Sequence, residues 1–306
     1  MSDKKWLSWR VYYELSEINI APLNIIWFIL GASIAYKWYH LHNIVNVLLC
    51  LTCVFLFDLA VNIADNYYDY QHSRDEVFRT QTNPIGRLHL PLDGVKKLMW
   101  ISYFISLIPG FILILRTGWP IFWIGVIGYI IGFFYSAGPK PINATIFCET
   151  AVALSISFLP VFSSFYVSIY GQLTLSWSMM GQVLLMCLPL TCLMFTIQLA
   201  NNVCDLDEDR RSGRFTLANK LEVHNGLVVI KWAIIIGMLF PVFLFFIGDV
   251  HWIVLLSCLV LPLALKNLQP FFNHPNKKTT FLLVIKNCSL FFILYIALVS
   301  VTFIFF

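Results

Sequence analysis

The chain has 306 residues, of which 59% are hydrophobic and only 12% are charged. A soluble globule of this length needs more polar surface, so the composition excludes that class and indicates an integral membrane protein. The net charge of +4 comes from basic residues spread over several loops, which excludes a nucleic-acid-binding stripe.

Runs of about 20 apolar residues are long enough to cross a bilayer. Nine segments of this kind follow one another, at residues 20–37, 44–65, 98–116, 119–137, 145–169, 178–201, 227–248, 251–272 and 279–306. No low-complexity linker separates them. We therefore predict an all-α fold, a multi-pass membrane bundle of about nine transmembrane helices in a single domain, residues 1–306.

The basic residues predict the orientation of this bundle. If the N-terminus is cytoplasmic, the outer loops hold only Lys37 and Arg116, and the inner segments hold most other Lys and Arg residues. The C-terminus would then lie outside. No cleavable signal peptide is visible, so the first span would act as its own signal. We expect a location in the cytoplasmic membrane.

A first polar cluster follows the second predicted span. It begins with the string N-I-A-D-N-Y-Y-D at 62–69 and comprises Asn62, Asp65, Asn66, Asp69 and Asp75. Residues three and four apart stack on one helix face, and one turn earlier Asp58 extends the same stripe. Carboxylates are costly near lipid, so this stripe indicates a functional site that faces the bundle interior.

A second polar cluster follows the sixth span, and its members are Asn201, Asn202, Asp205, Asp207 and Asp209. Here either Asn201 or Asn202 continues the stripe from Gln198 to Asp205 and Asp209. The two clusters lie on helices of the same orientation, which suggests an internal duplication of helices 1–4 in helices 5–8. We expect them to face each other on the cytoplasmic side.

Facing carboxylates repel one another unless a cation lies between them. Mg²⁺ prefers such oxygen ligands, and water and substrate phosphate fill its remaining coordination positions. We therefore expect the site to bind a diphosphate. Arg74, Arg79 and Arg87 follow the first cluster, and Arg210, Arg211 and Arg214 follow the second. They could bind phosphate oxygens or simply anchor the helices at the lipid headgroups.

These features together resemble the UbiA superfamily of intramembrane prenyltransferases, whose members have nine transmembrane helices and two aspartate-rich motifs after helices two and six. The strings at 62–69 and 201–210, with G-R-F-T-L at 213–217, look most like the menaquinone-pathway branch. The string Y-S-A-G-P-K-P at 135–141, followed by Glu149, is similar to a loop of that branch.

The resemblance implies transfer of a polyprenyl chain from an allylic diphosphate to an aromatic acid, 1,4-dihydroxy-2-naphthoate, with loss of the ring carboxylate to give demethylmenaquinone. Implied catalytic residues are Asp65, Asp69, Asp205 and Asp209, which would also hold Mg²⁺ together with Asp75. Implied substrate-binding residues are Asn62, Asn66, Asn201, Asn202, Arg74, Arg79, Arg87, Lys140, Arg210, Arg214, Tyr135 and Glu149. The implied partners are these substrates and membrane lipid, without an obligate protein partner.

The chain departs from the family pattern at two places. It reads Asp65-Asn66 where the family usually has Asn-Asp. Either Asp65 supplies the charge from a slightly rotated helix, or the site binds metal with one carboxylate fewer. Phe147 and Cys148 also replace the usual glycines before Glu149, which affects the expected acceptor contacts.

Three other functions compete with this hypothesis. A different acceptor, such as 4-hydroxybenzoate or protohaem, would keep the same fold and metal site. A CDP-alcohol phosphotransferase also uses intramembrane aspartates, but its D-G-x-x-A-R string is absent. A membrane transporter would place its polar groups near the bilayer midplane on interrupted helices. Here the polar clusters lie at helix ends, which favours an enzyme.

Overall fold

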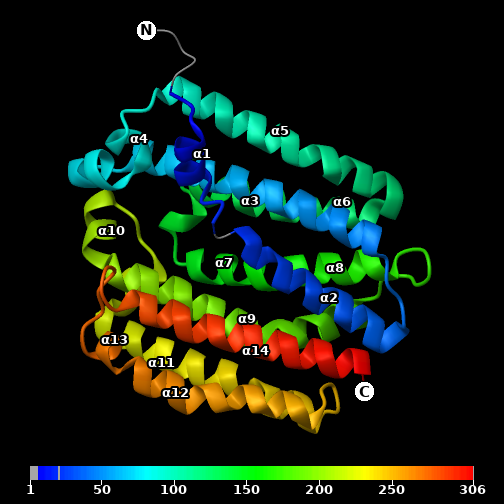
Figure 1. Ribbon diagram of the computed structural model, residues 1–306. Coiled ribbons are helices and arrows are strands. Elements are labelled where there is room, and N and C mark those ends of the chain that lie inside the picture. The colour runs from blue at the N-terminus through cyan, green and yellow to red at the C-terminus, as the bar shows by residue number, and fades with distance from the viewer. Residues whose placement is uncertain (1–5, 20, 306) are drawn as a thin grey trace.

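The computed structural model describes residues 6–19 and 21–305, and within these residues all regular structure is helical (Figure 1). In chain order the elements are α1 (Trp9–Ser16), η1 (Ala21–Leu23), α2 (Asn24–Tyr39), α3 (Ile44–His72), η2 (Phe78–Thr82), α4 (Pro84–Arg87), α5 (Leu92–Thr117), α6 (Trp119–Ser136), η3 (Ile142–Ala144), α7 (Cys148–Ser157), α8 (Leu159–Ile169), α9 (Trp177–Cys204), α10 (Leu206–Ser212), α11 (Leu217–Phe246), η4 (Trp252–Leu259), α12 (Val260–Asn267), α13 (Gln269–Asn273) and α14 (Phe281–Phe305).

Helices account for most of each of the nine apolar segments in the residues that the structure describes. Seven spans in the described residues are long and apolar enough to cross a membrane, namely α3, α5, α6, the pair α7 and α8, α9, α11 and α14. The other two segments are α2, which has 16 residues, and Trp252–Asn267, where η4 continues into α12. The predicted all-α, multi-pass bundle is therefore confirmed.

The helices that carry the polar clusters extend beyond the apolar runs. α3 continues to His72, although hydropathy predicted an end at residue 65, and α11 begins at Leu217, ten residues before the predicted 227. Hydropathy marks where a chain leaves the apolar layer and does not mark where its helix ends. As a result, the whole 62–69 string lies on one continuous helix.

Close contacts between helix backbones fix the centre of the bundle. α2 crosses α8 at Gly31, where an added Cβ would lie 2.2 Å from the carbonyl oxygen of Val161. At the same crossing, Ser164 Oγ donates a hydrogen bond to the carbonyl oxygen of Phe28, at 2.7 Å. A residue larger than glycine at position 31 would push these two helices apart.

Two large groups of buried side chains form the core. One joins α2, α8, α9, α11 and α14, and the other joins α1, α3 and α5. A third, smaller group of buried side chains from α2, α3, α5, α6 and α8 connects these two groups, and α7 completes the bundle. Figure 1 shows α4 and α10, the short helices that follow the two polar clusters, at the same end of the molecule.

Candidate active site

The side chains of Asp65 and Asn66 point to different surroundings at the end of α3. Asn66 Nδ2 donates hydrogen bonds to the carbonyl oxygens of Leu15 and Asn62, both at 3.1 Å, so Asn66 is turned toward the end of α1. Asp65 instead lines a cavity, and its Oδ1 is buried without a hydrogen-bond partner. The carboxylate of this pair thus lies on the interior face of α3.

Asp69, one turn after Asp65, lies on the same side of the helix. Its Oδ1 accepts a hydrogen bond from Asn143 Nδ2, at 3.4 Å, and the same carboxamide also lies beside Asp65. Asn143 belongs to η3, in the loop between α6 and α7. Asn143 could not be predicted as a site residue, because no local sequence pattern distinguishes it in that loop.

The loop after α3 is folded by its own polar residues. Asp75 Oδ1 accepts hydrogen bonds from the backbone N–H groups of Val77, at 2.8 Å, and Phe78, at 3.2 Å. Its Oδ2 lies 3.5 Å from Arg211 Nη2 on α10. Asp75 therefore links the loop after the first cluster to α10, which follows the second cluster. It lies further along the chain than Asp65 and Asp69.

The three basic residues predicted after the first cluster have separate environments. Arg87 pairs with Glu14 of α1, with Nη2 and Oε2 2.6 Å apart. Arg79 lies over the ring of Tyr70, 4.9 Å from its centroid. Arg74 is exposed and, in the described part of the chain, makes no side-chain hydrogen bond or ion pair. None of the three touches a carboxylate of the polar clusters.

In the second cluster, the side chains of the two neighbouring asparagines also have different partners. Asn201 Nδ2 lies 3.3 Å from Asp205 Oδ2, whereas Asn202 Nδ2 donates to Glu149 Oε1 on α7, at 2.9 Å. Glu149 is completely buried. Asn201 therefore continues the stripe that leads to Asp205, and the pair Asn202 and Glu149 joins α9 to α7.

The helix bends at Asp205, which lies between α9 and α10. After α10, Gly213 adopts a left-handed conformation, with φ of 75°, and the Arg214 N–H donates to the Asp209 carbonyl oxygen at 2.9 Å. This glycine C-cap reverses the chain. It brings Arg214 Nε within 3.4 Å of Asp209 Oδ1.

Arg214 connects the two clusters. Its guanidinium also donates to the carbonyl oxygen of Asn143, at 3.1 Å from Nη2, the residue whose side chain reaches Asp69. Burial disfavours its charge, but the carboxylates of Asp209, Asp69 and Asp65 outweigh burial and raise the pKa of Arg214. The acids of both clusters therefore act on one partly buried guanidinium.

Asp209 is only 3% exposed, and its Oδ2 has no hydrogen-bond partner. Burial raises the pKa of Asp209 to about 6; Arg214 opposes this rise and the nearby carboxylates of Asp205 and Glu208 add to it.

The other basic residues predicted for the site lie closer to solvent than Arg214. Arg210 pairs with Glu222, at 2.5 Å, and Lys140 is exposed on the loop before η3.

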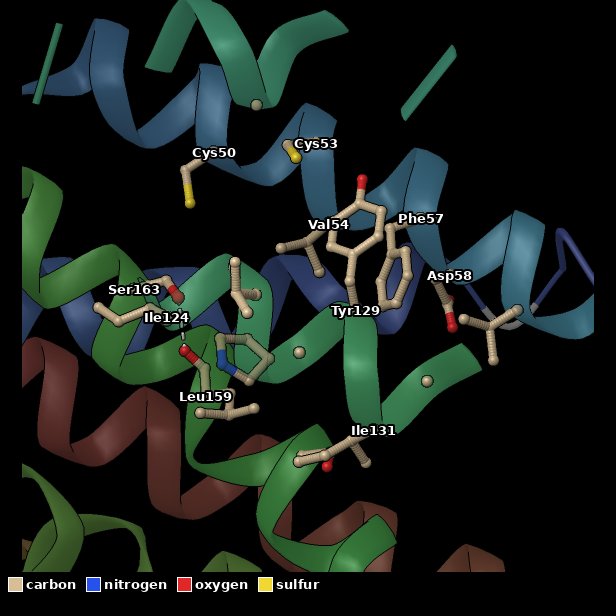
Figure 2. Close-up of a pocket in the computed structure, with 18 of the residues that line it drawn as sticks. Cys50, Cys53, Val54, Phe57, Asp58, Ile124, Tyr129, Ile131, Leu159 and Ser163 are labelled. Atoms are coloured by element: carbon tan, nitrogen blue, oxygen red, sulfur yellow. Dashed lines mark hydrogen bonds between the residues drawn. The ribbon is translucent and has the colours of Figure 1, made fainter. Parts of the chain in front are cut away.

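A cavity of about 720 Å³ begins beside the first cluster. Its polar end holds Asp58, Asn62, Asp65, Tyr135 and Gln198, and apolar residues of α3, α5, α6, α7 and α8 line the rest. Figure 2 shows Asp58 and Phe57 of α3 and Tyr129 and Ile131 of α6 among the side chains that line this space, with the rings of Phe57 and Tyr129 next to each other. The cavity thus joins a carboxylate-bearing end to a long apolar interior.

Four aromatic residues lie within or directly beside the sequence motifs: Tyr67, Tyr68, Phe134 and Tyr135. Only Tyr135 lines the cavity, where its hydroxyl accepts a hydrogen bond from Gln198 Nε2, at 3.4 Å. Phe57 and Tyr129 line it as well, with ring centroids 4.1 Å apart. They come from the middle of their helices, where composition gave no reason to prefer them to other aromatic residues.

The described residues contain no group of three His, Cys, Asp or Glu side chains arranged to hold a metal ion. Mg²⁺ requires fewer protein ligands, because one or two carboxylates suffice when substrate phosphates and water complete its shell. The buried, unpartnered oxygens of Asp65 and Asp209 are donors of the type that this ion prefers. The residues therefore fit Mg²⁺ that binds together with a phosphorylated substrate.

Comparison with known proteins gives a consistent result. The model of the UbiA prenyltransferase family matches residues 25–304. The 1,4-dihydroxy-2-naphthoate octaprenyltransferase of Bacillus subtilis is 25% identical over 222 residues, which cover 72% of this chain and 68% of that protein. The protein of the same name in Haemophilus influenzae is 22% identical over 241 residues, covering 74% and 75%.

Solved structures share the fold at low sequence identity. The apo structure of a UbiA homolog from Aeropyrum pernix K1 superposes with a TM-score of 0.68 and 13% identity, covering 92% of this chain and 98% of that one. A UbiA homolog from Archaeoglobus fulgidus bound to GPP and Mg²⁺ gives a TM-score of 0.65 at 12% identity, covering 96% and 99%.

Proposed function

Because this chain belongs to the UbiA prenyltransferase family, we propose that it transfers a polyprenyl chain from an allylic diphosphate to 1,4-dihydroxy-2-naphthoate. Two relatives that are named octaprenyltransferases for this acceptor support the choice of substrate. The Archaeoglobus homolog that was solved with GPP and Mg²⁺ supports a prenyl diphosphate as donor and Mg²⁺ as cofactor.

The junction between the polar clusters and the apolar cavity carries this proposal. Asn62 and Asp65 belong to the first cluster and also line the cavity, so a single molecule can reach both environments. A polyprenyl tail gains about 0.8 kcal/mol for each methylene that leaves water, whereas its diphosphate must stay paired with cations. The cavity would take the tail and the clusters would take the diphosphate.

Several charged groups would act on the diphosphate. Mg²⁺ held by Asp65, Asp69, Asp205 and Asp209 would neutralise the charge that develops on the leaving group. Arg214 fixes the loop of Asn143 against Asp209 and so keeps the two clusters at a set separation. Arg211, beside Asp75, and the exposed Arg74 can supply donors to phosphate oxygens from the solvent side.

The chemical step would begin when the allylic C–O bond breaks and its electron pair leaves with the diphosphate. The rings of Tyr135, Phe57 and Tyr129 line the cavity and can shelter an allylic cation through their π-faces without forming a bond to it. The electron-rich naphthoate ring then forms the new C–C bond. Its carboxylate departs as CO₂ from the same carbon, which restores the aromatic ring as demethylmenaquinol.

The distribution of basic residues supports a location in the cytoplasmic membrane, with the polar clusters on the cytoplasmic side. At that position the diphosphate head would meet cytosolic Mg²⁺ and the tail would remain within the bilayer.

Mass spectrometry of the product tests the choice of acceptor. Purified protein in detergent is supplied with Mg²⁺, an octaprenyl diphosphate and, separately, 1,4-dihydroxy-2-naphthoate, 4-hydroxybenzoate or protohaem. We expect a prenylated, decarboxylated naphthoquinol from the first acceptor alone. A prenylated product from 4-hydroxybenzoate or protohaem and none from the naphthoate would overturn the proposed acceptor while leaving prenyl transfer intact.

A further inference from the structure

A lysine from a distant part of the chain occupies the second polar cluster. Lys277 lies between α13 and α14, and its ammonium donates hydrogen bonds to Asn201 Oδ1 and Asp205 Oδ2. The ammonium also lies 5.4 Å from the centroid of the Phe281 ring. Lys277 is thus the direct cationic partner of an aspartate that the proposed function assigns to Mg²⁺.

The turn that carries Lys277 is held by its own hydrogen bonds. Asn276 Oδ1 accepts from the backbone N–H groups of Lys278 and Thr279, each at 3.0 Å. Thr280 Oγ1 accepts from the Asn276 N–H at 2.9 Å and donates to the His274 carbonyl oxygen at the same distance. The position of Lys277 therefore follows from a preorganised turn at the start of α14.

The contact between Lys277 and Asp205 is suited to exchange. The side chains of Lys277 and Asp205 are 44% and 24% exposed, and ion pairs with this much access to solvent are weak. Mg²⁺ needs the same carboxylate oxygen, since Asp205 Oδ2 is the atom that the ammonium contacts. The ammonium and the metal ion therefore compete for one acceptor.

We propose that Lys277 is a diphosphate-binding residue, which neutralises Asp205 in the free enzyme and transfers its ammonium to the substrate diphosphate when Mg²⁺ takes Asp205. This inference rests on the proposed function for the identity of the anion. A lysine ammonium is a mobile point charge with three donors, so it can change partners without movement of the backbone.

Two binding measurements on the full-length protein in detergent test the exchange. The first is the affinity for Mn²⁺ without substrate, followed by electron paramagnetic resonance. The second is the affinity for geranyl diphosphate with saturating Mg²⁺ and without an acceptor, followed by calorimetry. The variants are Lys277→Met, Lys277→Arg and the control Lys278→Met, which removes an equal charge from the same turn; the side chain of Lys278 contacts neither Asn201 nor Asp205.

In Lys277→Met we expect Mn²⁺ to bind about three- to tenfold more tightly, because its competitor is gone, and geranyl diphosphate to bind about tenfold more weakly. Lys277→Arg should retain most of the affinity for geranyl diphosphate, and Lys278→Met should match the wild type in both measurements. Opposite shifts of the two affinities are specific to exchange, since damage to the fold would weaken both.

Unchanged or weaker Mn²⁺ binding in Lys277→Met would overturn the proposal, as would unchanged affinity for geranyl diphosphate. Equal effects of Lys277→Met and Lys278→Met would also overturn it, because they would reflect net charge alone. Neither measurement needs an aromatic acceptor. A wild-type protein that binds both ligands but prenylates no aromatic acid would therefore contradict the proposed function and leave this test intact.

Discussion

Substitutions at Asp65 and Asn66 offer a sharp test of the site, because these neighbours have opposite surroundings. Asp65→Asn replaces a carboxylate that lines the cavity and has one buried oxygen without a hydrogen-bond partner. A neutral amide is a weaker ligand for Mg²⁺, and loss of one charge-assisted contact costs about 1.5–3 kcal/mol, or about 10- to 100-fold in affinity. We expect the Mg²⁺ requirement of Asp65→Asn to rise by this factor.

Asn66→Asp should not compensate for this loss. The Asn66 amide donates to the carbonyl oxygen of Leu15 near the C-terminus of α1, and a carboxylate there would lose that donor and face the negative end of the helix dipole. We expect a destabilisation of about 1–3 kcal/mol. The double variant, which has the usual family order, should therefore keep the raised Mg²⁺ requirement of Asp65→Asn and be less stable.

The assays are titration of product formation with Mg²⁺ and thermal unfolding in detergent. Recovery of wild-type activity in the double variant would refute the assigned orientation, because residue 66 would then have to reach the metal. An unchanged Mg²⁺ requirement in Asp65→Asn would equally remove Asp65 from the site.

Three further predictions concern protons, chain length and orientation. The pKa of Asp209 is raised to about 6, so protons compete with the metal ion for this carboxylate below neutral pH. The affinity for Mn²⁺ should therefore fall as the pH drops from 7 to 5 in the wild type, and it should fall less in Asp209→Asn. Equal pH profiles of the two proteins would contradict this prediction. Gly125 lines the cavity, and no atom lies within 4 Å of a Cβ added there. Gly125→Leu would fill part of the cavity and should lower the rate with octaprenyl diphosphate at least about tenfold relative to the rate with geranyl diphosphate. The control Gly181→Leu lies outside the cavity and should leave that ratio of rates unchanged. A membrane-impermeant thiol reagent added outside the cell should label Asp249→Cys, but not Ser73→Cys or Ser212→Cys, above the parent protein, and the reverse pattern would invert the proposed topology.

The apolar runs and the spacing of polar residues were sufficient to predict the helical bundle and the residues at the ends of α3 and α9. They could not decide between Asp65 and Asn66 or between Asn201 and Asn202, because neighbouring helix positions differ by only about 100° and either can lie near the interior face. Tertiary partners decide these cases, namely the carbonyl of Leu15 and the carboxylate of Glu149.

Other residues of the site come from loops that are distant in the chain. Lys277 is 72 positions from Asp205, and Asn143 is 74 positions from Asp69. A lone lysine or asparagine in a polar loop carries no periodic pattern, so its partner emerges only when the chain is folded. The cavity is equally hidden from sequence, since it depends on the packing of apolar residues from several helices.

The central claim is that the two polar clusters form one site for a diphosphate, and the release of pyrophosphate tests it most directly. Wild-type protein, Asp69→Asn and Asp205→Asn are each supplied with prenyl diphosphate, Mg²⁺ and 1,4-dihydroxy-2-naphthoate, and their folding is checked by thermal unfolding. We predict one pyrophosphate per prenylated product in the wild type and a loss of at least about 100-fold in both variants, since each removes a charged ligand of the same leaving group. Near-normal release from either folded variant would contradict the account.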